Sequence, residues 1–193
     1  MIAEIAEEGI VLSADKRVTL DGAWKDNCIK AFAVGDKTAV GIVGKQVAHP
    51  RTIKRLLNKN FDKLNGRTVY DRAVAIARVI ADHDDESNIP SQMKLTVVGY
   101  DEVTPHIYEI EIMRSEVSAP KDRSPYIVSH DKIAYEITSR GLVAVHQKDY
   151  KKESYATTLK RHRKLIVETS SLNDSVSPTS DNYLITPNSI DRI

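Results

Sequence analysis

Charged side chains follow directly after an uninterrupted apolar run near the start of the chain. Ile10, Val11 and Leu12 do not alternate with polar residues, which predicts a strand buried on both faces. Asp15 and Arg17 come just after this run. Because an unpaired buried charge costs several kcal/mol, these two residues must be solvated, paired as ions at the strand end or used in chemistry.

The same stretch is the first of an ordered series of segments. The series comprises residues 9–19, 28–36, 38–44, 95–101 and 105–108. In its order and spacing it resembles the proteasome β-type family of N-terminal-nucleophile (Ntn) hydrolases, including the related bacterial ring proteases. The resemblance runs from Met1 to about Ile112 and returns near Asp174. It implies an α+β fold with one domain over residues 1–193, a four-layer αββα sandwich of two antiparallel sheets flanked by helices.

The resemblance also implies an activity, which is proteolysis by an N-terminal threonine. Amide hydrolysis by a hydroxyl needs an activated nucleophile, a base and donors for the oxyanion. In Ntn enzymes the nucleophile is the first residue, and its own amine, with an ordinary pKa near ~8, helps as the base. The resemblance thus implies a peptide or protein substrate, no cofactor, and a homo-oligomeric ring or one shared with other proteasome-like subunits.

Six residues match the family's catalytic set: Asp15, Arg17, Lys30, Gly44, Asp174 and Ser177. By the resemblance, Lys30 lowers the pKa of the nucleophile, Asp15 pairs with Lys30, and Arg17 braces Asp15. The backbone N–H of Gly44 would form the oxyanion hole, and Asp174 and Ser177 would hold the N-terminal amine. Without the family, Lys30 could instead be a strand-end lysine that reaches water. Gly44 could be a turn or strand-end glycine, and residues 174–177 an ordinary turn.

The nucleophile itself does not appear in the sequence. If Gly9 is matched to the family's turn glycine, the nucleophile falls two positions ahead of Met1. Removing the initiator would expose Ile2, which has no nucleophilic atom, and Cys28 is internal. One hypothesis is that the true start lies upstream, with a threonine two residues before Met1. The alternatives are a non-catalytic structural subunit of a proteasome-like ring and an Ntn-fold amidohydrolase that acts on a small amide.

Two further positions differ from the family pattern. The glycine-serine-glycine turn expected before the third helix is absent from residues 125–130, where Ser129 is the candidate for its serine. Pro178 follows Ser177, where family members usually have glycine. The downstream part of the chain therefore departs from the family at two places.

The composition is that of an ordinary globular domain. Hydrophobic residues make up 41% and charged residues 28% of the chain, and the net charge is +1. This balance favours neither nucleic acid nor a membrane as a partner. Cys28 is the one cysteine, which fits a reducing compartment, and no apolar run of about 18 residues or signal-peptide core occurs. We therefore expect a cytoplasmic protein, and the scattered histidines predict no metal site.

Hydrophobic periodicity predicts the elements that position these residues. Strands are predicted for residues 1–6, 10–14, 28–34, 38–43, 93–100, 107–113 and 183–186. The first four are predicted to pair as two hairpins, through turns at residues 7–9 and 35–37. Helices are predicted for residues 48–60, 68–82 and 152–168. The first has Phe61 at the end of its apolar stripe, and the second begins with a capping box of Thr68 and Asp71.

The remaining segments are predicted to be irregular or are ambiguous. Residues 20–27, with Asp-Gly and Asp-Asn turn formers, predict a loop or an irregular ribbon. Residues 114–126 and 170–181 are typical of loops and turns, and residues 187–193 of a tail. Residues 127–145 suggest a helix broken by Gly141, but the pattern is ambiguous. The run Lys-Arg-His-Arg-Lys at 160–164 predicts a basic helix face. That face is either solvated or a docking strip for an acidic ligand or a neighbouring subunit.

Overall fold

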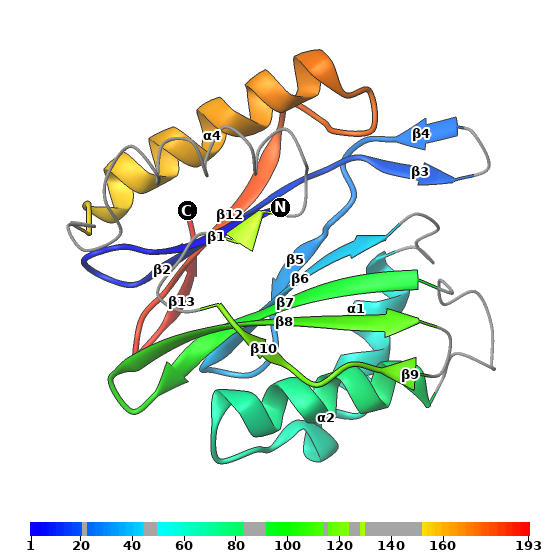
Figure 1. The fold of residues 1–193 in the computed structure, drawn as a ribbon, viewed down its shortest axis with the longest axis vertical. Helices are drawn as coiled ribbons and strands as arrows, with labels where there is room; N and C mark the ends of the chain where they lie inside the picture. Colours follow the sequence, from blue (N-terminus) through cyan, green and yellow to red (C-terminus); the bar gives the residue numbers. More distant parts are fainter. Residues whose placement is uncertain (21–22, 45–49, 83–91, 114–115, 124–127, 130–151) are drawn as a thin grey trace.

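The computed structural model describes residues 1–20, 23–44, 50–82, 92–113, 116–123, 128–129 and 152–193. Its strands form two large antiparallel sheets and one short ribbon, and its helices lie outside the two sheets (Figure 1). Within these residues, no helix combines the length and the apolar character needed to cross a membrane. The predicted helix at 127–145 lies almost wholly outside the described residues.

The first sheet carries the start and the end of the chain. Its strands run in the order β11 (Val128–Ser129), β1 (Ile2–Ile5), β2 (Ile10–Asp15), β12 (Ser180–Ile185) and β13 (Ile190–Arg192). The predicted hairpin is confirmed: β1 and β2 pair antiparallel, with Ile5 opposite Ile10 and Ile2 opposite Ser13. All residues of both strands are buried, because the sheet is covered on both faces.

The second sheet is built from the middle of the chain. Its strands run in the order β10 (Lys121–Asp122), β8 (Thr104–Met113), β7 (Gln92–Asp101), β6 (Thr38–Gly44) and β5 (Ala31–Ala33), and β9 (Glu116–Val117) also pairs with β8. The β5–β6 turn contains Gly35 at φ +69°, a conformation that favours glycine. This hairpin was predicted, and so were the two strands β7 and β8, whereas β9 and β10 lie in a stretch that was predicted to be a loop.

The helices complete a layered sandwich. Helix α4 (Tyr155–Leu172) covers the outer face of the first sheet, while α1 (Pro50–Lys59) and α2 (Val69–Ala81) cover the second (Figure 1). The capping box that begins α2 is confirmed, since the Thr68 side chain accepts from the Asp71 N–H and the Asp71 carboxylate accepts from the Thr68 N–H. The layers are therefore helix, sheet, sheet and helices, as predicted.

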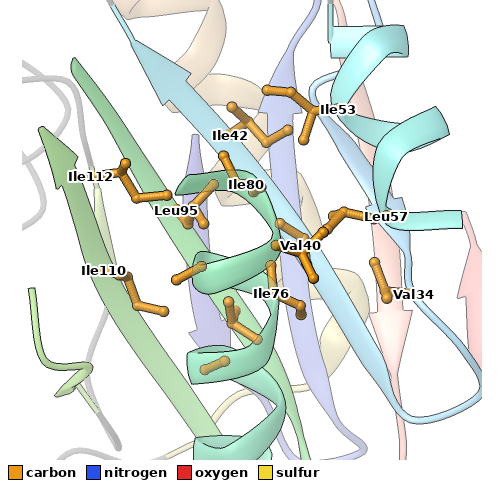
Figure 2. Close-up of a cluster of buried hydrophobic side chains, with 14 of the residues drawn as sticks. Val34, Val40, Ile42, Ile53, Leu57, Ile76, Ile80, Leu95, Ile110 and Ile112 are labelled. Atoms are coloured by element: carbon orange, nitrogen blue, oxygen red, sulfur yellow. The ribbon is translucent and has the colours of Figure 1, made fainter. Parts of the chain in front are cut away.

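Two apolar cores hold these layers together. One lies between α1, α2 and the second sheet, and Figure 2 shows Ile53 and Leu57 of α1 and Ile76 and Ile80 of α2 pointing toward the strands. The other lies between the two sheets and includes Leu12, Ala31 and Val98. Because burying one aliphatic side chain contributes about 1.5–3 kcal/mol, these two clusters are the main source of stability.

The structure corrects several sequence-based predictions. β3 (Val18–Leu20) and β4 (Ala23–Lys25) pair as a regular two-stranded ribbon, where residues 20–27 were predicted to be a loop or an irregular ribbon. Residues 190–192, predicted to be part of a tail, form β13 and pair with β12. Phe61 does not belong to α1 but begins a short 3-10 helix, η1 (Phe61–Leu64), and its side chain is 43% exposed.

The last helix also differs from its prediction. It extends to Leu172 rather than residue 168. The basic run at 160–164 is not one solvated face, because His162 is fully buried and the Arg161 guanidinium binds Glu4. Lys160, Arg163 and Lys164 are exposed. The run therefore divides between the inner and outer faces of the helix, as the helical period requires.

Candidate active site

An ion pair joins the two sheets at the end of β2. The Lys30 Nζ atom lies 3.0 Å from Oδ1 and 2.9 Å from Oδ2 of Asp15. The side chains of Lys30 and Asp15 are only 12% and 5% exposed. Lys30 immediately precedes β5, and its carbonyl accepts the Ile42 N–H of β6. The lysine thus reaches from the edge of the second sheet to the first and is not a strand-end lysine that extends into water.

Asp15 accepts further hydrogen bonds from the backbone. Its Oδ2 atom accepts the Arg17 N–H at 3.1 Å and the Ser177 N–H at 3.3 Å. Together with Lys30, these donors compensate the cost of burying a carboxylate. Asp15 is therefore the point at which three segments meet: the end of β2, the approach to β5 and the chain before β12.

The Arg17 side chain does not pair with Asp15. The sequence left open an ion pair between these two residues, and that prediction is wrong. Its guanidinium donates to both carboxylate oxygens of Asp26, at 2.8 and 3.0 Å, and to the Asp174 carbonyl at 2.7 Å. The hydrogen bond to Asp26 raises the pKa of Arg17. The guanidinium also lies 5.4 Å from the centre of the Trp24 ring. Arg17 thus links the ribbon to the chain after α4.

Residues 174–177 lie where α4 gives way to β12. The turn here is made by Asn173, whose Oδ1 accepts from both the N–H and the hydroxyl of Ser175. Ser177 is 2% exposed, and its hydroxyl lies 2.9 Å from the Thr179 hydroxyl. The segment is an ordinary turn in its local geometry, and it also contacts Asp15 through Ser177 and Arg17 through Asp174.

Five of the six predicted site residues are therefore connected in one network. Gly44 is the exception. It ends β6, opposite Met93 of β7, and among the described residues no hydrogen bond or ion pair connects it to the other five. Its position at the end of β6 is the one observation that concerns its predicted role in the oxyanion hole.

Met1 lies between the sheets at the start of the first strand. Its side chain is 7% exposed and belongs to the core between the sheets, together with Ala14 and Ala31. A Cβ atom at Gly41 of β6 would overlap the Met1 sulfur. The absence of a side chain at Gly41 therefore provides the space that the Met1 side chain occupies. The start of β1 therefore points into the space between the two sheets, on the same side as Ala31.

The sequence did not identify two of the residues around this site. Asp26 binds Arg17, and Trp24 is 55% exposed beside it. Both lie on or next to β4, which was not predicted as a strand. The available signal was the pair Asp21-Gly22 between Leu20 and Ala23, since Asp-Gly is typical of two-residue hairpin loops.

Two face-to-face antiparallel sheets between helices, with a buried lysine–aspartate pair joining them, define an Ntn-hydrolase sandwich. The family described as "Proteasome subunit" matches residues 1–117. This is more than half of the chain, so the chain belongs to the proteasome subunit family. No curated protein matches the sequence closely enough to count as a relative.

Two solved structures show the same fold. Anbu (ancestral beta-subunit) from Yersinia bercovieri is similar over 100% of this chain and 86% of its own, with a TM-score of 0.72 and 14% sequence identity. The helical assembly of the Anbu complex from Pseudomonas aeruginosa is similar over 100% of this chain and 85% of that one, with a TM-score of 0.74 and 16% identity. At these identities the likeness concerns the fold alone.

Proposed function

We propose that this chain is a proteasome-like subunit that hydrolyses peptide bonds through a threonine two positions ahead of Met1. The observation that supports this proposal is the Lys30–Asp15 pair, buried at the end of β2 beside the start of β1. β1 pairs with β2 so that Ile2 is opposite Ser13. If β1 continues upstream in that register, the first added residue is opposite Asp15 and the second is opposite Lys16.

The alternation of a strand places the second added residue on the same face as Met1. That face points between the sheets, toward Ala31, and Lys30 is the residue just before Ala31. A threonine at this position would therefore lie close to the Lys30 ammonium. No rearrangement of β1 or β2 is needed for this placement.

The chemistry follows from these neighbours. The threonine hydroxyl would attack the substrate carbonyl, and its proton would pass to the α-amine and then to the leaving amine, which gives an ester between enzyme and substrate. Water would then hydrolyse the ester. The Lys30 ammonium, paired with Asp15, would stabilise the forming alkoxide. By family resemblance, the Gly44 N–H would bind the oxyanion, while Asp174 and Ser177 would orient the amine.

A second candidate is a non-catalytic structural subunit. The observation that favours it is the buried Met1 side chain, which fills the space between the sheets and has no nucleophilic group. In that case the Lys30–Asp15 pair is structural. The two candidates differ in activity and not in fold.

For either candidate we propose assembly with further copies of the chain or with other proteasome-like subunits. The support is the fold shared with the Anbu complex from Pseudomonas aeruginosa, which is described as a helical assembly. We also propose a cytoplasmic location, because a single cysteine, Cys28, fits a reducing compartment. Native mass spectrometry would give the number of copies in the assembly.

An extended chain tests the proposed activity. Thr-Ala is added ahead of Met1 and released from an N-terminal fusion, so that threonine carries the free amine. We expect cleavage of an unfolded protein and of fluorogenic peptides at a rate about a thousandfold or more above a matched Ala-Ala extension, because the control lacks the nucleophile. If both chains fold and assemble alike but neither cleaves, the chain is a non-catalytic subunit.

A further inference from the structure

A fully buried histidine joins α4 to the first hairpin. His162 of α4 is 0% exposed, as are Glu4 of β1 and Ser13 of β2. The His162 Nδ1 atom lies 3.0 Å from the Ser13 hydroxyl, and its Nε2 atom lies 3.1 Å from Oε2 of Glu4. One imidazole thus connects its own helix to two strands that are far from it in sequence.

The partners determine which ring nitrogen carries the proton. An ionised carboxylate can only accept, so the His162 Nε2 atom must donate to Glu4. The Nδ1 atom of a neutral ring is then an acceptor, and it receives the Ser13 hydroxyl hydrogen. Among the described residues, the Ser13 hydroxyl has no other hydrogen-bond partner. The network is fully satisfied with one proton on the ring.

A second proton on the ring would upset this arrangement. With Nδ1 protonated, Ser13 could no longer donate to it, and a buried hydroxyl hydrogen would lose its acceptor. Glu4 is also already paired, because its Oε1 atom lies 2.5 Å from the Arg161 guanidinium. The imidazolium would be a second cation beside the Glu4 carboxylate, close to the Arg161 guanidinium.

Among the described residues, the charged groups that face His162 are Glu4 of β1, Arg161 of α4 and, in a chain that begins at Met1, the amine of Met1. Ser13, from β2, is uncharged. Burial lowers the pKa of His162, the hydrogen bond and charge of Glu4 raise it, and Arg161 and the Met1 amine lower it, with a net lowering. The ring is therefore neutral in the folded protein at neutral pH.

We propose that His162 is a proton-operated latch: its neutral ring holds α4 on the β1–β2 hairpin, and because the ring takes up a second proton only when this contact opens, the contact weakens as the solution becomes weakly acidic. Two of the segments that the latch joins, β2 and α4, lead into the candidate site. Ser13 is two residues before Asp15, and α4 leads directly into the segment that contacts Asp15 and Arg17. The proposal rests on this geometry and holds whether or not the chain is a peptidase.

The sign of the pH effect follows from proton linkage. The unfolded chain binds a proton at His162 near the ordinary histidine pKa of about 6.5, whereas the folded chain binds it only at lower pH. Stability from the latch is therefore fully present above about pH 6.5 and is lost as the pH falls below it. One such group changes the ratio of folded to unfolded protein by about tenfold per pH unit in that window.

The first measurement is nuclear magnetic resonance of the imidazole in the full chain, between about pH 7.5 and about pH 5.5. We expect His162 to keep its Nε2–H tautomer, while an exposed histidine becomes doubly protonated near a pKa of about 6.5. Titration of His162 at or above that value, or a ring with its proton on Nδ1, would overturn the proposal. This readout uses the unaltered protein and does not depend on any variant folding.

The second measurement is the unfolding equilibrium over the same pH range at a fixed protein concentration. His162→Gln keeps a donor toward Glu4 but cannot titrate, so we expect its stability to lose the tenfold-per-unit slope. His106→Gln is the matched control, since His106 belongs to the other sheet and its side chain is 21% exposed. The latch is disproved if the His162→Gln protein keeps the slope of the wild type.

Discussion

Replacing Lys30 with methionine is expected to slow peptide hydrolysis by about a thousandfold in a chain that carries the added N-terminal threonine. The substitution keeps an unbranched side chain but removes the ammonium group that binds Asp15 at the end of β2. Loss of a group that stabilises a forming oxyanion or alkoxide costs about 10²–10³ in rate. We expect a loss at the upper end of this range, measured as the turnover of a fluorogenic peptide.

The same substitution has a separate effect on stability. Asp15 would remain buried, with only the N–H groups of Arg17 and Ser177 to bind it. Breaking a buried ion pair in this way costs about 3 kcal/mol, which urea denaturation would measure. The double variant Lys30→Met with Asp15→Asn removes the uncompensated charge, so it should regain stability without regaining activity. Retained turnover in Lys30→Met would show that the pair is structural, and so would a chain that no longer folds.

Replacing Glu4 with glutamine is expected to destabilise the protein by about 3 kcal/mol, at the lower end of the range for a broken buried pair. Glu4 uses its two oxygens for two different donors, Arg161 at 2.5 Å and the His162 ring at 3.1 Å. Glutamine offers one oxygen, so one of these donors would face the amide N–H₂ group in a fully buried position. Arg161 keeps its pairing with Glu153, which limits the loss.

Glu111→Gln provides the matched control. Glu111 pairs with Lys94 at 2.7 Å, but the side chains of Lys94 and Glu111 are 45% and 36% exposed. An exposed pair contributes about 0–1 kcal/mol whatever its distance. The prediction is contradicted if Glu4→Gln lowers the free energy of unfolding, measured by urea denaturation, no more than Glu111→Gln does. The buried network around His162 would then contribute no more to stability than an exposed ion pair.

Much of the fold could be predicted from local sequence signals. The β1–β2 hairpin follows from Gly9 between two short apolar runs, and the start of α2 follows from the capping pair of Thr68 and Asp71. Such features depend on residues close together in the chain. The two regular strands of the β3–β4 ribbon were not predicted, because they are short and Ala23, Trp24 and Lys25 are all exposed, so no alternating pattern indicated them.

The contacts of the site were harder to predict. The Lys30–Asp15 pair came from the family resemblance, whereas the partners of Arg17 depend on how the ribbon and the end of α4 approach each other. The burial of His162 was not predicted, because the basic residues on both sides of it suggested a solvated helix face. Its spacing from Leu159 and Leu165 places it on the buried stripe of α4, and that spacing was the signal available in the sequence.

The proposed activity depends most on the residue that begins the working protein. The most direct test is N-terminal sequencing of the protein purified from its own cells. We predict a threonine two residues ahead of Met1, which would complete a threonine-protease site with Lys30 and Asp15. An amino terminus at Met1 or Ile2 would contradict this prediction, because the chain would then carry the supporting residues without a nucleophile and would be a non-proteolytic subunit.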